Sequence, residues 1–87
     1  MGSLRFDGVR FTFYSHDHPP VHVHGFYAGI EVVLDVYPDY VMRSKRKKNI
    51  KPANAKASDV AHIENTAATH RVELLAIWRK IDAASRR

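Results

Sequence analysis

Apolar and polar residues alternate along the first half of the chain, which is typical of half-buried strands. The first strand is expected around Phe11, the second from about Val21 to Phe26, and the third from Ile30 onward. A short edge strand is expected over residues 40–42. Ala28-Gly29 and Pro38-Asp39 indicate turns, so consecutive strands are expected to pair as an antiparallel meander. Asp7-Gly8 is interpreted as a bulge before the first strand. The apolar positions of the first and third strands are Val9, Phe11 and Phe13, and then Ile30, Val32, Leu34 and Val36.

After Ser58 the pattern changes to the three- and four-residue spacing of an amphipathic helix. At about 1.5 Å per residue, a helix over residues 59–84 would span roughly 39 Å, which is longer than a domain this small needs. The helix is therefore expected either to break near Asn65-Thr66 or to protrude toward a partner. Its apolar stripe consists of Val60, Ile63, Ala67, His70, Leu74, Ile77 and Ile81.

Residues 43–57 contain few large apolar groups and one proline, so they are expected to form a loop. The chain then divides into strands over about residues 4–42, a basic loop over about 43–57, and a C-terminal helix over about 58–84. We predict a single α+β domain over residues 1–87, in which a small antiparallel meander of about three to four strands packs against the long C-terminal helix. One sheet face or the end of the helix stays open for association, with a protein partner or with a second copy as a homodimer.

Composition excludes several classes of protein. The chain has 87 residues and room for one domain, and such a domain buries roughly 60 to 65% of the surface that its unfolded chain exposes, so a large enclosed active site is not expected. There is no cysteine, so any metal must be held by His, Asp or Glu, and a reducing cytoplasm fits. No apolar run approaches the roughly 20 residues that cross a bilayer. We therefore predict a cytoplasmic protein with no membrane partner.

Basic residues gather in one short stretch of a chain in which Lys and Arg outnumber Asp and Glu 14 to 9. One interpretation is that this stretch contacts the phosphates of RNA or DNA. The other is a solvated loop whose charge keeps the protein in water. No aromatic residue interrupts the run, so base stacking is not expected there. The candidate nucleic-acid-binding residues are Arg43, Lys45, Arg46, Lys47, Lys48 and Lys51.

Four of the six histidines lie within residues 16–24. Imidazole has an unperturbed pKa of about 6.5, so it can donate a proton, accept one or bind a metal near neutral pH. Pro19-Pro20 favours extended backbone, and the alternation of a strand then places His22 and His24 side by side on one face. His16 and His18 have the same spacing, so all four rings converge if the prolines fold one pair back toward the other.

Three functions are compatible with this cluster. In the first, His18, His22 or His24 acts as general acid or base on a phosphodiester, and no cofactor is needed. In the second, His22 and His24 bind a divalent transition metal such as Zn²⁺, and Asp17, His16 or His18 completes the ligand set. In the third, the histidines have only structural roles and the protein works by binding another protein. The sequence leaves open whether the protein is an enzyme.

Two short motifs and the C-terminal helix carry a resemblance to a known family. The motifs are Asp17-His18-Pro19-Pro20-Val21-His22-Val23-His24 and Tyr27-Ala28-Gly29, and the helix pattern is that of residues 70–78. They resemble a small bacterial family known as domain of unknown function 4160, whose members carry a DHPPPHFHV-like motif. The chain departs from that pattern around His22 and in its longer basic middle stretch. The resemblance implies a cytoplasmic bacterial protein that acts as the toxin-like half of a toxin–antitoxin module, with a small antitoxin-like partner.

Overall fold

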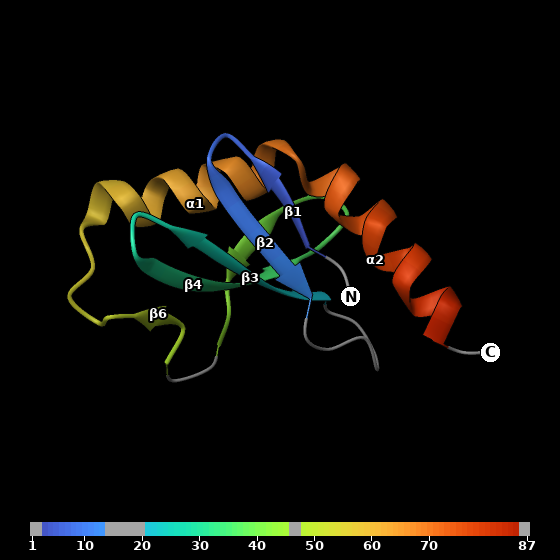
Figure 1. Ribbon diagram of the computed structural model, residues 1–87, viewed down its shortest axis with the longest axis horizontal. Coiled ribbons are helices and arrows are strands. Elements are labelled where there is room, and N and C mark those ends of the chain that lie inside the picture. Colours follow the sequence, from blue (N-terminus) through green and yellow to red (C-terminus); the bar gives the residue numbers. More distant parts are fainter. Residues whose placement is uncertain (1–2, 14–20, 46–47, 86–87) are drawn as a thin grey trace.

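In the computed structural model, which describes residues 3–13, 21–45 and 48–85, the first half of the chain forms an antiparallel sheet and the C-terminal part forms two helices (Figure 1). The predicted α+β class, an antiparallel meander against a C-terminal helical segment, is confirmed, although the sheet has more strands than the three to four expected. The strands are β1 (Ser3–Phe6), β2 (Val9–Phe13), β3 (Val21–Tyr27), β4 (Ile30–Val36), β5 (Val41–Arg43) and β6 (Ile50–Lys51). The helices are α1 (Ala57–Thr69) and α2 (Arg71–Ser85).

The strands follow one another through the sheet in the order β1-β2-β3-β4-β5, and every neighbouring pair is antiparallel. β5 and β6 share the outer edge of β4, where β5 pairs with residues 34–36 and β6 pairs with residues 31–32. The stretch over 43–57 was expected to be a loop, but it contains β6. A strand of two residues is too short to produce an alternating pattern, which is why the sequence did not reveal it.

Two-residue turns with positive φ angles join β1 to β2 and β3 to β4. Asp7 and Gly8 have φ angles of 50° and 81°, and Ala28 and Gly29 have φ angles of 53° and 79°. Consecutive left-handed residues suit tight hairpins because their twist matches that of the flanking strands. The prediction of a bulge at Asp7-Gly8 was therefore wrong, because these residues form the turn of a hairpin whose first strand is β1.

The core lies between the helices and one face of the sheet. Helix α1 packs on β3, β4 and β5, and Gly25 of β3 leaves room for one of its side chains. A Cβ atom placed on Gly25 would lie 2.6 Å from Cγ2 of Ile63 and 3.2 Å from Cε1 of Phe11. The largest side chains that are fully buried are Phe11, Leu34, Ile63, Leu74, Val9, Val23, Val32 and Val36.

The helical segment breaks at His70, and not near Asn65-Thr66 as expected. Thr66 stays inside α1 because it is buried and its hydroxyl donates a hydrogen bond to the carbonyl of His62. The ring of His70 stacks on Phe6 of β1, with ring centroids 4.0 Å apart and planes 10° from parallel. This contact with the first hairpin marks the point where α2 turns away from α1 toward the edge of the molecule (Figure 1). Neither helix, over the residues described, is long and apolar enough to cross a membrane.

Candidate active site on the open sheet face

The second face of the sheet carries different chemistry from the face that packs on the helices. The hydrophobic core takes its strand residues from one face only. We call the other face the open face, and the pairing register places on it the side chains of Arg5, Arg10, Thr12, His22, His24, Phe26, Glu31, Val33, Asp35, Met42 and Lys51. Three of these residues, Thr12, Val33 and Asp35, are nevertheless buried. The centre of the open face is therefore not an ordinary solvated strand surface.

His22 and Asp35 form the first pair on this face. They lie directly opposite each other on β3 and β4, and Nδ1 of His22 donates a hydrogen bond to Oδ1 of Asp35 over 2.6 Å. The side chain of Asp35 is 5% exposed, and that of His22 is 22% exposed. A carboxylate at Nδ1 fixes the orientation and the tautomer of the ring, so in the neutral imidazole Nε2 is the nitrogen that can accept a proton.

His24 and Glu31 form the second pair. In register His24 lies between Thr12 on β2 and Val33 on β4, so its ring reaches diagonally along β4 to the glutamate. Nδ1 of His24 donates to Oε2 of Glu31 over 2.6 Å. Both side chains are mostly buried, at 14% and 20% exposed. Two neighbouring imidazoles are thus oriented by carboxylates through the same ring nitrogen.

A buried hydroxyl and two cations lie beside these pairs. Oγ1 of Thr12, opposite His24, is buried and has no hydrogen-bond partner within the described part of the chain. A buried hydroxyl without a partner is unusual, because buried polar groups nearly always have a hydrogen-bond partner. Arg10 and Lys51 flank the face on β2 and β6. The site therefore combines two oriented imidazoles, an available hydroxyl and positive charge.

Comparison with known proteins gives one result. The model of a protein family described as Domain of unknown function (DUF4160) matches residues 8–79. The chain belongs to this family. No curated protein and no solved structure matches it. The matched residues of this DUF4160 protein run from the start of β2 into α2, so they include both imidazole–carboxylate pairs.

Of the five residues in the predicted metal ligand set, the structure places two. His22 and His24 share the open face, whereas His16, Asp17 and His18 lie outside the described residues. His18 is also the third candidate general acid or base, so the structure places two of the three. In the residues that the structure describes, no group of three or more His, Cys, Asp or Glu side chains could hold a metal ion. The metal site of this DUF4160 protein stays a prediction.

The predicted nucleic-acid-binding residues do not share one surface. Nε of Arg43 donates to Oε2 of Glu64 on α1 over 2.7 Å, and this hydrogen bond raises the pKa of Arg43 above its usual value. Arg43 therefore faces the helix side of the sheet, whereas Lys51 lies on the open face. Of the other four, Lys45 and Lys48 are exposed. Arg46 and Lys47 lie outside the described residues.

Sequence reasoning missed the two carboxylates and Phe26. Asp35 and Glu31 were interpreted only as polar positions of an alternating strand. A signal was available in the turn, because a two-residue turn at 28–29 places Tyr27 opposite Ile30 and, counting outward, His22 opposite Asp35. The register of a hairpin follows from its loop length, so the first imidazole–carboxylate pair of this DUF4160 protein could have been predicted.

Proposed function

We propose that the protein cleaves RNA by general acid–base catalysis at His22 and His24, without a metal cofactor. The observation that supports this proposal is the pair of neighbouring imidazoles, each held at Nδ1 by a carboxylate 2.6 Å away. A carboxylate in that position orients the ring and stabilises the imidazolium that forms when Nε2 takes a proton. Proton transfer of this kind contributes typically about 10² to 10⁴-fold to a rate.

The reaction needs one imidazole as base and one imidazolium as acid. His22 is assigned as the base because its Nε2 has no hydrogen-bond partner among the residues described, and Asp35 beside it is the more buried carboxylate. It takes the proton of the ribose 2′-hydroxyl as that oxygen attacks phosphorus. His24 gives a proton to the departing 5′-oxygen. The products are a 2′,3′-cyclic phosphate and a 5′-hydroxyl, and Arg10 and Lys51 offset the charge on the phosphate.

The wider biological role is part of the same proposal. An enzyme that cleaves RNA in its own cytoplasm inhibits growth unless a partner blocks it. This is the toxin-like role that the family resemblance implies, and a small antitoxin-like protein that covers the open face would supply the control. The part of α2 that turns away from α1 offers a further surface for such a partner (Figure 1), and on it Val72 is 66% exposed.

Alanine substitution of both histidines tests the catalytic proposal. His22→Ala with His24→Ala is expected to abolish cleavage of an RNA oligonucleotide and growth inhibition, while the circular dichroism spectrum stays the same. His62→Gln is a matched control, because His62 lies on α1, where its ring contacts Tyr27. Cleavage retained by the double variant would refute the proposal.

Metal binding is the second candidate, favoured by the same two hydrogen bonds. Histidines that bind a metal commonly donate their other ring N–H to a carboxylate, as His22 and His24 do through Nδ1. Zn²⁺ or another divalent transition metal would then sit at Nε2, with His16, Asp17 or His18 as predicted further ligands. Elemental analysis of protein purified without an affinity tag decides between the two. A ratio near one metal per chain that falls in the double variant supports this second function, and a ratio near zero removes it.

A further inference from the structure

Five side chains form a row across the open face, beside the imidazoles. The register places Arg5 opposite Arg10, Arg10 opposite Phe26, Phe26 opposite Glu31, and Glu31 opposite Lys51. We call these five residues the transverse row. It crosses β3 two residues from His24, which is roughly 6.6 Å along a strand. A ligand held on the row thus lies next to the two imidazoles.

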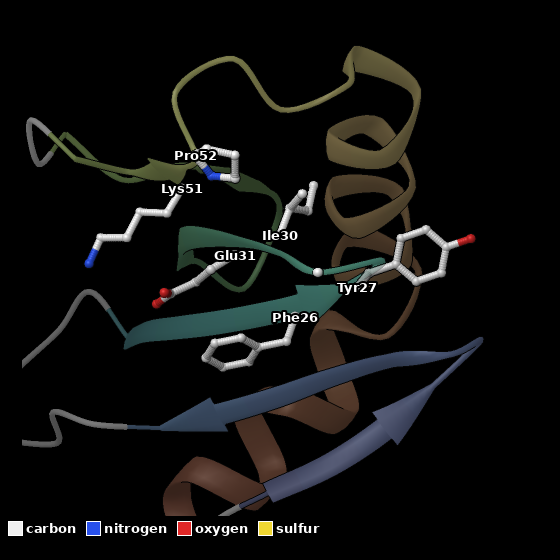
Figure 2. A pocket seen from close by; sticks show the side chains of 7 residues that line it. Phe26, Tyr27, Ile30, Glu31, Lys51 and Pro52 are labelled. Carbon is white, nitrogen blue, oxygen red and sulfur yellow. The ribbon is translucent and has the colours of Figure 1, made fainter.

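Phe26 is the aromatic residue of the row and borders an open groove. The guanidinium carbon of Arg10 lies 4.6 Å from the centre of the Phe26 ring. The groove has a volume of about 540 Å³, and its lining includes Phe26, Ile30, Glu31, Lys51 and Pro52 (Figure 2). Figure 2 shows Phe26, Glu31 and Lys51 extending to one side of the hairpin, so their side chains border the groove together.

The charges of the row favour an anion. Arg5, Arg10 and Lys51 have no ion pair with a carboxylate anywhere in the described residues, and Glu31 is bonded to His24. The whole chain carries a net charge of +5. Thr12, two residues from Arg10 on β2, is 7% exposed and its hydroxyl has no partner in the part of the chain described. A ligand with a flat ring, a phosphate and hydrogen-bonding oxygens matches all three features.

We propose that the transverse row is a nucleotide subsite that selects single-stranded RNA. One base stacks in the groove against Phe26 and Arg10, and the flanking phosphates contact Arg5, Arg10 and Lys51. Unpaired bases stack on aromatic side chains and guanidinium groups, whereas the bases of a duplex are already stacked and cannot enter. The inference rests on the proposed function, because the row positions the neighbouring phosphodiester beside His22 and His24.

A probe that cannot be cleaved separates binding from catalysis. A fluorescent single-stranded 2′-O-methyl RNA of about ten nucleotides lacks the attacking hydroxyl, so its anisotropy reports affinity alone. Phe26→Leu is expected to weaken binding about tenfold, because stacking is lost, and Phe26→Trp is expected to restore it. The matched control is Tyr40→Leu, an exposed aromatic residue at the opposite end of the β3–β4 hairpin, and it should leave affinity unchanged. A duplex of the same sequence should bind at least about tenfold more weakly.

The salt dependence identifies the cations. Neutralising Arg10 and Lys51 together is expected to reduce the slope of log affinity against log salt by about 1.4, because each phosphate contact on a single strand contributes roughly 0.7. Neutralising Lys45 and Lys48 in the basic stretch should leave the slope unchanged.

Each outcome supports or overturns the subsite. It is overturned if Phe26→Leu binds the probe as the wild type does, if a duplex competes equally, or if the wild type binds no single strand, as for a face that recognises only protein. Loss of affinity in Phe26→Leu together with full cleavage by the double histidine variant keeps the subsite and rejects the catalytic proposal. Unchanged affinity in Phe26→Leu together with loss of cleavage in the double histidine variant keeps the catalytic proposal and rejects the subsite.

Discussion

The two faces of this sheet are built by the same strands, yet they carry different kinds of side chain. On the helix-covered face Phe11, Val23 and Leu34 are fully buried in the hydrophobic core. On the open face the alternate residues of the same strands include two imidazoles, two carboxylates and an aromatic ring. Strand alternation thus lets one short chain place its hydrophobic core on one side and the candidate site on the other.

The open face differs from an ordinary polar strand surface in how much of it is buried. Asp35 is 4% exposed, although an ionised carboxylate loses several kcal/mol of hydration when it is buried without a partner. The imidazole of His22 supplies that partner. A solvated strand face would need neither the burial of Asp35 nor its hydrogen bond with His22, and both are features that the candidate site requires.

The largest effect on the free energy of unfolding is expected when a phenylalanine is truncated to alanine, first on one face and then on the other. Phe11→Ala empties a fully buried position, and such truncations cost about 3 to 5 kcal/mol. Phe26→Ala truncates a half-buried ring on the neighbouring strand and should cost roughly 1 kcal/mol, because less apolar area leaves water there. Urea denaturation followed by circular dichroism measures both. Equal losses would show that the open face also carries the stability of the fold.

Asp35→Asn should produce the next largest effect, on activity more than on stability. The amide keeps the shape of the carboxylate but not its charge, so it no longer stabilises the His22 imidazolium. Cleavage of RNA is expected to fall about 10² to 10³-fold. The loss of unfolding free energy should be smaller than for Phe11→Ala, because no cavity forms. If kcat/KM stays within about threefold of the wild type, the hydrogen bond at Nδ1 has no part in catalysis.

Much of the fold could be predicted from local patterns. Alternation located three of the strands, and the turn residues at 28–29 located the hairpin that holds the site. The missed features depend on contacts between distant segments. β6 is stabilised by pairing with β4, and the break at His70 coincides with the stacking of His70 on Phe6. Neither contact leaves a periodic signal in the sequence.

The candidate site was predicted only as far as one strand allows. Period-two alternation puts His22 and His24 on a common face, whatever the rest of the sheet does. Their partners, Asp35 and Glu31, lie on another strand and require the register. The placement of the basic residues depends on register for the same reason: they are close in sequence, but β5 and β6 place Arg43 and Lys51 on opposite faces.

Gly25→Ala adds a methyl group to the helix-covered face and should cost about 1 to 3 kcal/mol. The new Cβ would lie 2.6 Å from Cγ2 of Ile63, so α1 has to move or the side chain must change rotamer. Denaturation of Gly25→Ala, Ile63→Ala and the double variant checks the cause. The double variant should lose less than the sum of the single losses, because the smaller residue at 63 makes room for the methyl group. Additive losses would mean that the two positions do not touch.

The smallest effect is expected from Arg43→Gln, which removes the ion pair between β5 and α1. Its two side chains are 47% and 28% exposed, so solvent and salt screen the pair and its contribution to stability is well under about 1 kcal/mol. The hydrogen bond that Arg43 donates to Glu64 raises the pKa of Arg43 above its usual value, so the guanidinium stays charged at every lower pH and the contribution is lost as the pH rises through that raised pKa. Affinity for the single-stranded probe should not change, because Arg43 lies on the helix side of the sheet. A fall comparable to that of the Arg10 and Lys51 variants would return RNA binding to the basic stretch and remove the distinction between the faces.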